Sequence, residues 1–307
     1  MSLPLAGFKV CYMGSYKPDY VRNHVMIGAL EAAGAQVTCL RATGGWRQRY
    51  RHYLRHFPAD ADAVIVAFGG LMDTPAAWLL SRRKRLPLVL DSFSSPYEAR
   101  VIDREVIAAN SLKSFKLFWV EKLIYKLADA ILFTTATHCD VIAAMIGEPR
   151  HKFHRIWAGA EPEFYQPQPE CAEQSPFRVF FVGTMIPLHG TEFIVQAAHL
   201  LRDKEPDIRF TIVGRGQTYD AIRALADRLD TRNIEFVDWM TPAQLAQAMT
   251  QSHVCLGMFG DRPKSNISIA NKVFMALAAQ RCVITGRTPA VEEALVHQDN
   301  AWLVPSG

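Results

Sequence analysis

Short apolar runs alternate with amphipathic stretches along the first half of the chain. Residues 8–13 form an apolar run, a polar loop follows, and residues 23–34 have helical spacing that stops at Gly34. Strands that alternate with helices in this way predict a parallel sheet with helices on both faces. The further strands are expected at 36–42, 62–70, 86–92 and 129–135, and the further helices at 46–56, 74–83, 98–127 and 137–146.

A second series of the same kind begins after a segment of different composition. Residues 161–176 are rich in Pro, Glu and Gln and have no apolar period, so they are expected to link two domains, 1–165 and 176–307. We therefore predict an α/β fold of two tandem Rossmann-like domains. The strands of the second are expected at 177–184, 208–216, 234–240, 253–259, 281–286 and 301–305, and its helices at 190–203, 217–229, 242–251, 268–279 and 289–297.

Length and composition agree with two globular domains. The chain has 307 residues, of which 50% are hydrophobic and 21% charged. No stretch approaches the roughly 20 apolar residues that span a bilayer, and the first residues lack the pattern of a signal peptide, so a cytoplasmic protein is expected. The six cysteines have no metal-ligand spacing, and no metal and no cofactor are expected.

Ligands of open α/β sheets bind at the carboxyl ends of the strands, which directs attention to the loops there. In the second half, Gly183 and Thr184 end a strand, and His189 and Gly190 precede a helix whose amide groups could face a phosphate. The alternative is a plain tight turn.

Two further loops of the second half carry candidate donor-binding residues. Gly214 and Gly216 follow a strand and would allow a ligand to approach closely. Tyr219 stands where a dinucleotide fingerprint needs its third glycine, although Asp238 keeps a nicotinamide ligand as an alternative.

The loop after the strand expected at 253–259 supplies positive charge. Lys264, Asn271 and Lys272 surround another junction between a strand and a helix, and lysine is suited to a diphosphate. Both lysines could instead be exposed loop residues.

In the first half, Asp91 follows a strand and is a candidate for orienting an acceptor or acting as a base, unless it only caps its loop. His138, at the start of a predicted helix, is a candidate for contact with an acceptor or a phosphate, and the alternative is an ordinary surface histidine.

The order and spacing of these motifs resemble a known family. VGT…PLHG, TIVGRG, NKVFMALAAQRCVITG and NAWLVP resemble the donor half of family 4 glycosyltransferases of GT-B architecture over nearly all of residues 177–307. MGSYKPDYVRN, LDSFSSPYE and ADAILFTTATH resemble the acceptor half more weakly. The resemblance implies two domains across a cleft, further helices beyond Gly307, and transfer of a sugar from a UDP- or GDP-linked nucleotide sugar, with retention and without a metal.

The sequence departs from that family at several donor positions. Thr184 and His189 stand where the family usually has Arg and Lys, and Ile267 and Met275 stand where it has carboxylates. A non-catalytic scaffold that acts as a binding subunit therefore stays open as an alternative. A sugar-nucleotide epimerase on the same architecture is a further alternative.

The first half is also basic. Residues 1–165 contain 21 Lys and Arg against 15 Asp and Glu, whereas the rest contains 13 against 15. Lysines and aromatic residues mix at helical spacing in residues 111–130, which suits either peripheral contact with an anionic membrane or a core helix with solvated lysines. A glycan or lipid-linked acceptor is expected, and nucleic acid is not, since no recognition motif accompanies the charge.

Overall fold

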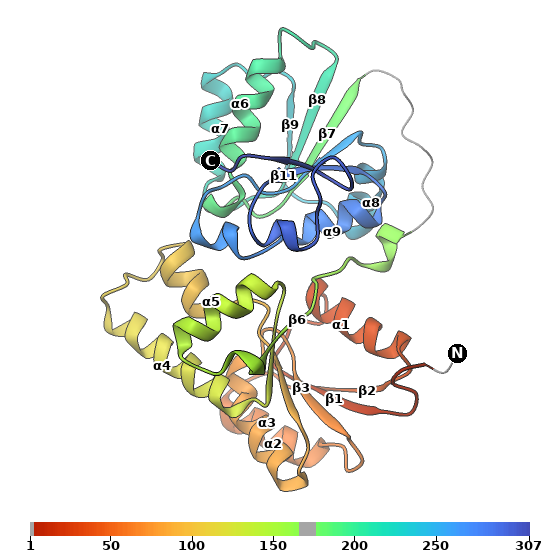
Figure 1. Cartoon of the computed structure of the whole chain (residues 1–307), viewed down its shortest axis with the longest axis vertical. Coiled ribbons are helices and arrows are strands. Elements are labelled where there is room, and N and C mark those ends of the chain that lie inside the picture. Colours follow the sequence, from red (N-terminus) through yellow and green to blue (C-terminus); the bar gives the residue numbers. More distant parts are fainter. Residues whose placement is uncertain (1–2, 166–175) are drawn as a thin grey trace. The chain divides into compact units, whose positions relative to one another are not determined.

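The computed structural model describes residues 3–165 and 176–307 and forms two compact units (Figure 1). The first unit runs to Val101 and continues over Glu105–Trp157, and the second comprises Ile102–Arg104 and Ala158–Gly307. Within the described residues each unit is built on a parallel six-stranded sheet with helices, as the alternating pattern predicts. Most of the predicted linker, residues 166–175, lies outside the described residues.

The first sheet has the strand order β2-β1-β3-β4-β5-β6, and every pair is parallel. The order reverses between β1 and β3, which makes the carboxyl ends of these two strands the switch point of the unit. Its strands are β1 (Lys9–Gly14), β2 (Gln36–Arg41), β3 (Ala63–Val66), β4 (Leu88–Asp91), β5 (Ala130–Phe133) and β6 (Phe153–Arg155).

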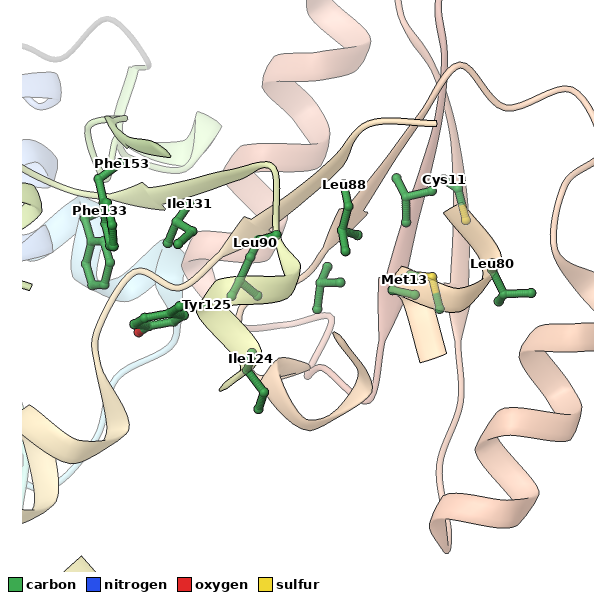
Figure 2. Packing of buried hydrophobic residues seen from close by; sticks show 14 of the residues in the cluster. Cys11, Met13, Leu80, Leu88, Leu90, Ile124, Tyr125, Ile131, Phe133 and Phe153 are labelled. Atoms are coloured by element: carbon green, nitrogen blue, oxygen red, sulfur yellow. The ribbon is translucent and has the colours of Figure 1, made fainter. Parts of the chain in front are cut away.

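The helices of the first unit divide between the two faces of its sheet. Met26 of α1 packs on one face with Val10, Tyr12 and Ile65, and the other helices share the core on the opposite face, part of which Figure 2 shows. This arrangement agrees with right-handed crossovers between parallel strands. The helices are α1 (Val21–Ala32), α2 (Trp46–His56), α3 (Thr74–Lys84), α4 (Leu112–Leu127) and α5 (Ala136–Ile146).

The second sheet has the order β12-β11-β10-β7-β8-β9, again with parallel pairs, and its switch point lies between β7 and β10. Helices α6 and α7 pack on one apolar core with β7 and β8. The strands are β7 (Phe177–Val182), β8 (Ile208–Val213), β9 (Ile234–Val237), β10 (Val254–Leu256), β11 (Cys282–Gly286) and β12 (Trp302–Val304). The helices are α6 (Thr191–Leu201), α7 (Tyr219–Arg228), α8 (Pro242–Thr250) and α9 (Asn271–Ala278).

The structure interrupts the long helix that the sequence predicts over 98–127. Residues Glu98–Asp103 form a π-helix, Glu105 has a positive φ of 52°, and α4 begins only at Leu112. The Ser111 hydroxyl caps α4 by accepting a hydrogen bond from the Ser114 amide at 3.1 Å. The sequence predicts one helix here because its apolar spacing continues across the break. Ser111, which caps α4, is the local sign that a new helix begins.

Two other predictions differ at the ends of the domains. The helix expected over 289–297 is reduced to a 3-10 turn, Val291–Glu293, because the Asn300 side chain accepts the Val296 amide at 2.8 Å in place of a helical carbonyl. Strand β6 was not predicted, since it has three residues of which only Phe153 is buried.

Residues 158–165, which the sequence assigns to the first domain, belong to the second unit. The 3-10 turn Pro162–Tyr165 packs against α8 and α9, and the Phe164 side chain is completely buried there. The segment that ends the expected first domain therefore packs with the second unit.

Phe164→Ala should destabilise the second unit by about 3–5 kcal/mol, because it leaves a cavity in a closed core. Hydrogen exchange of the full chain should show faster exchange within 177–307 and unchanged protection within 9–155. Tyr165→Ala, which removes an exposed ring, is the control and should change stability by no more than about 0.5 kcal/mol. Loss of protection confined to the first unit would assign the segment to that unit instead.

Candidate functional site

The loops that follow β7 and β10 meet at the switch point of the second sheet. The Phe259 amide donates to the His189 carbonyl at 3.1 Å, and Gly190 has a positive φ of 59°. A Cβ on Gly190 would lie 2.5 Å from the Gly260 nitrogen, so no other residue fits without a shift of the backbone. The two loops form one packed platform at the carboxyl edge of the sheet.

The loop after β8 packs directly on the loop after β7. The Met185 amide donates to the Arg215 carbonyl at 3.1 Å, and a Cβ on Gly216 would lie 2.5 Å from the Met185 carbonyl oxygen. A Cβ on Gly214 would meet the carbonyl oxygen of Gly183 in the same way. These glycines are required by the approach of two backbones. Their predicted closeness to a donor stays a prediction.

Lys272, the second residue of α9, is the most unusual group at this edge. Its residue is 6% exposed, and its Nζ lies 3.9 Å from the centre of the Phe181 ring. Among the described residues Nζ has no hydrogen-bond partner. Burial lowers the pKa of Lys272 well below that of an ordinary lysine. The alternative of an exposed loop lysine is wrong for this residue.

His189 lies beside Lys272. A Cβ built on Gly183 would be 2.7 Å from Lys272 Nζ and 3.0 Å from His189 Cε1, so the two side chains converge on this glycine. Burial, and then the charge of Lys272, lowers the pKa of His189 well below its usual value, which keeps the imidazole neutral at physiological pH. His189 Nδ1 and the Thr191 hydroxyl are also buried without a hydrogen-bond partner in the part of the chain that the structure describes.

The other predicted donor residues surround this point at different depths. Lys264 is buried in the 3-10 turn Pro263–Asn266, which packs against the turn that contains His189. Asn271 opens α9 and is partly exposed, and Thr184 is exposed. The structure therefore brings the predicted residues of three loops to one edge of one sheet. They are Gly183, Thr184, His189, Gly190, Gly214, Gly216, Lys264, Asn271 and Lys272.

Buried polar groups in folded proteins are almost always paired, and an unpaired cation is especially costly. Lys272 Nζ and the Thr191 hydroxyl can each donate a hydrogen bond, and His189 Nδ1 can donate one in the tautomer that places the ring proton there. An oxyanion placed at Gly183 would satisfy such donors and would favour the charged form of Lys272. The arrangement has the chemistry of a site for a phosphate or diphosphate.

The residues at the two carboxylate positions of the family that the chain resembles are buried and apolar. Ile267 is 7% exposed and Met275 is 6% exposed. Asp238, which would mark a nicotinamide site, is exposed and forms an ion pair with Arg215 at 3.0 Å. Within the described residues no group of three or more His, Cys, Asp or Glu is placed to hold a metal ion.

In the first unit, Asp91 is held by a buried arginine. Arg22 Nε lies 2.9 Å from Asp91 Oδ2 and Nη2 lies 3.0 Å from Oδ1, a bidentate pair with both side chains buried. Burial raises the pKa of the Asp91 carboxyl, an effect that the Arg22 guanidinium opposes. Arg22 also donates to the Trp157 carbonyl at 3.0 Å. Asp91 thus ties the start of α1 to the end of β4, and its role as a base stays a prediction.

His138 is likewise buried, at 1% exposure, so the alternative of a surface histidine is wrong. Its Nε2 lies 3.2 Å from Glu98 Oε2, and its amide nitrogen donates to the Thr135 hydroxyl that caps α5. Its Nδ1 has no hydrogen-bond partner within the described residues. As it stands, the side chain orients the Glu98 segment, and its contact with an acceptor stays a prediction.

Sequence analysis did not single out the partners that define these environments. Phe181 is one apolar residue in a strand of apolar residues, and Thr191 follows a glycine at a helix start, which is common. Arg22 lies within a resembling segment but carried no separate signal, and Glu98 is 40 positions from His138. Each of these pairings depends on how strands and helices are brought together in space.

The comparisons with known proteins agree with this architecture. Residues 176–307 match the family model described as "Glycosyl transferases group 1". No curated protein matches the chain by sequence. No helix among the described residues is both long and apolar enough to cross a membrane.

Several solved glycosyltransferase structures share the fold of the chain. HepE from Anabaena, solved with UDP-glucose, is 14% identical, with 97% of this chain and 86% of that chain covered and a TM-score of 0.67. Sucrose-phosphate synthase from Thermosynechococcus elongatus is 14% identical with the same coverages and a TM-score of 0.69. The lipopolysaccharide outer core galactosyltransferase WaaB is 12% identical, with 98% and 87% covered and a TM-score of 0.60.

These matches cover both units of the chain and agree with the predicted architecture. The phosphate-type site of the second unit lies inside the segment that the family model matches. The second domain therefore matches the model of the group 1 glycosyl transferases, and the whole chain has the two-domain GT-B fold of these solved glycosyltransferases.

Proposed function

We propose that the chain transfers a sugar from a nucleotide sugar, bound by the second domain, to a hydroxyl group of an acceptor bound by the first. The observation that carries the proposal is the buried Nζ of Lys272, which has no hydrogen-bond partner among the described residues and lies beside His189 at the phosphate-type edge of the sheet. In such a transfer the bond between the sugar C1 and the diphosphate oxygen breaks, and its electron pair leaves with the diphosphate. The new bond joins C1 to the acceptor oxygen, which loses its proton to a base.

Lys272 and His189 act on the charge that develops on the leaving diphosphate. Lys272 supplies a cation in a site shielded from water, where electrostatic stabilisation is strongest, and neutral His189 donates a hydrogen bond. Lys264 adds a second cation on the adjacent turn. With this charge in place the reaction proceeds without a metal, and the resemblance to family 4 enzymes favours retention at the anomeric carbon. Asp91 and His138 stay the candidates for the base.

The ligands of similar structures support a donor class for the proposal. HepE was solved with UDP-glucose and TarM from S. aureus with UDP and α-GlcNAc-glycerol, which favours a UDP-linked hexose as donor here. The acceptor is a glycan or a lipid-linked sugar. For a lipid-linked acceptor the basic first domain would work in peripheral contact with a membrane.

A second candidate function is binding of a nucleotide sugar without transfer, as a partner subunit. The apolar, buried side chains of Ile267 and Met275 favour it, because they offer the ribose no carboxylate acceptor. Turnover separates the two functions, since a binding subunit would retain the donor site and release no free nucleoside diphosphate.

Incubation of the chain with UDP-, GDP- and ADP-sugars and a panel of glycan and lipid-linked acceptors should yield glycosylated product with one donor base. Lys272→Met should lower that transfer at least a hundredfold, since it removes the cation from the leaving group. Lys204→Met, at an exposed position of the same domain, is the matched control. Product formed by the Lys272 variant at the wild-type rate would exclude the proposed mechanism, and donor binding without product would leave the partner subunit.

Lys272→Met should also stabilise the protein without ligand, by about 1–3 kcal/mol, because it removes a buried and unpaired polar group. The folded-state pKa of Lys272 lies below its unfolded value, so the lysine destabilises most at low pH. The gain should therefore shrink as the pH rises through the folded pKa towards that of a free lysine. Urea unfolding of both proteins across this range measures it, and a destabilised variant would mean that Lys272 is paired in the free protein.

UDP affinity should fall with rising pH. A bound diphosphate raises the low pKa of Lys272, so above the free-state pKa binding must take up a proton. Calorimetry in two buffers of different ionisation enthalpy should show this proton uptake for the wild type and none for Lys272→Met. Equal uptake in both proteins would assign the proton to another group.

A further inference from the structure

Helix α4 of the first domain presents large apolar side chains to solvent. Leu112 is 80% exposed, Phe115 62% and Leu123 61%, and Trp119 and Val120 are also exposed. The spacing of Leu112, Phe115, Trp119 and Leu123 places them along one stripe of the helix. The opposite side of α4 contributes Ile124 and Tyr125 to the core, as Figure 2 shows. The helix is apolar on both sides, and the described residues of the first unit cover one of them.

Lysines border the exposed stripe. Lys113, Lys116 and Lys126 are exposed, and Lys122 Nζ lies 5.5 Å from the Trp119 ring. Glu121, the single acidic residue of the helix, is fully buried and accepts the Tyr97 amide at 2.8 Å. The outer surface of α4 therefore combines apolar side chains with cations and has no exposed carboxylate.

The neighbouring helices on the same face of the sheet extend this charge. Helix α3 packs between α2 and α4. Together α2, α3 and α4 contain 11 Lys and Arg, four in α2, three in α3 and four in α4, against the one buried Glu121. Trp46 and Leu54 of α2 are exposed among the arginines. Arg49 and Arg82 are paired with Asp73 and Asp129, and the remaining cations still leave an excess of positive charge that attracts an anionic surface.

A hollow with a volume of about 710 Å³ lies at the start of the apolar stripe. It is lined by Tyr97 and Phe118 together with Leu112, Phe115 and Trp119 of the stripe. Its volume lies in the range of small-molecule pockets, and its apolar and aromatic lining suits an apolar group.

We propose that the α4 surface, defined by Leu112, Phe115, Trp119, Val120, Leu123 and the lysines at 113, 116, 122 and 126, binds the protein to an anionic membrane. The apolar stripe enters the boundary between headgroups and acyl chains, and the lysines contact the lipid phosphates, as in amphipathic helices that lie in the membrane plane. Membrane binding itself does not depend on the proposed function. Its role in bringing a lipid-linked acceptor to the first domain rests on that function.

The lysines and the apolar stripe together favour an anionic membrane over other partners. Nucleic acid would suit the charge but would leave the aliphatic side chains Leu112 and Leu123 against water or phosphate. A second copy of the chain would place one set of these lysines against another, which is unfavourable. An anionic bilayer satisfies both the lysines and the apolar stripe.

Co-sedimentation of the full chain with vesicles tests the surface without any sugar transfer. The wild type should bind vesicles of phosphatidylcholine and phosphatidylglycerol and should bind those of phosphatidylcholine alone far more weakly. Leu112→Ser, Phe115→Ser and Leu123→Ser combined should weaken binding roughly a hundredfold. Lys113→Gln, Lys116→Gln and Lys126→Gln combined should weaken it by a similar factor, and this difference should disappear at high salt.

Matched controls lie on exposed positions of the second domain. Leu200→Ser, Trp239→Ser and Val296→Ser remove equally exposed apolar side chains, and Lys204→Gln, Arg209→Gln and Arg228→Gln remove equal charge. Both control triples should bind like the wild type. Circular dichroism and melting temperature should confirm that every triple variant is folded.

Several outcomes would overturn the proposal. These are no binding to anionic vesicles, binding that the α4 triples leave unchanged, or equal weakening by the control triples. A concentration-dependent dimer that Leu112→Ser, Phe115→Ser and Leu123→Ser dissolves, without vesicle binding, would assign the surface to a second copy. If vesicle binding is shown but no donor supports transfer, the membrane surface stands and the proposed enzyme does not.

Discussion

The chemistry proposed for this protein depends on one buried and unsatisfied cation. Lys272 has its ammonium group against the Phe181 ring, beside the neutral imidazole of His189, with no acceptor among the described residues. A fold tolerates such a group at a cost in stability, and sites of binding and catalysis are where this cost is usually found. Gly183 leaves room for the lysine, and Gly190, Gly214 and Gly216 let the backbones of the surrounding loops approach closely.

The position of Lys272 offers a source of positive charge where the first glycine loop departs from the family 4 pattern. Thr184 and His189 occupy positions where family 4 enzymes usually carry cations, and His189 is uncharged in this environment. Lys272 reaches the same loop from α9, so positive charge arrives from the opposite side of the switch point. The apolar Ile267 and Met275 have no such replacement among the predicted residues, and they weaken the case for tight recognition of the ribose.

Much of the fold could be predicted from the sequence, since parallel strands buried on both faces give continuous apolar runs and crossover helices give amphipathic ones. The failures have local causes. The apolar spacing continues through residues 98–127, although α4 begins only after its cap, Ser111. The Asn300 side chain takes the place of a helical carbonyl near the end of the helix predicted over 289–297. Strand β6 is too short to show an apolar pattern. For the candidate site, the sequence identified the loops and lysines, but the burial of Lys272 and the pairing of Asp91 with Arg22 depend on contacts between distant segments.

A crystal structure of the chain with UDP tests the central claim most directly. The diphosphate should lie over Gly183, with an oxygen within hydrogen-bond distance of Lys272 Nζ and a second contact to His189 or Thr191. UDP bound elsewhere, with Lys272 still unpaired beneath the Phe181 ring, would contradict the assignment of this edge as the donor site.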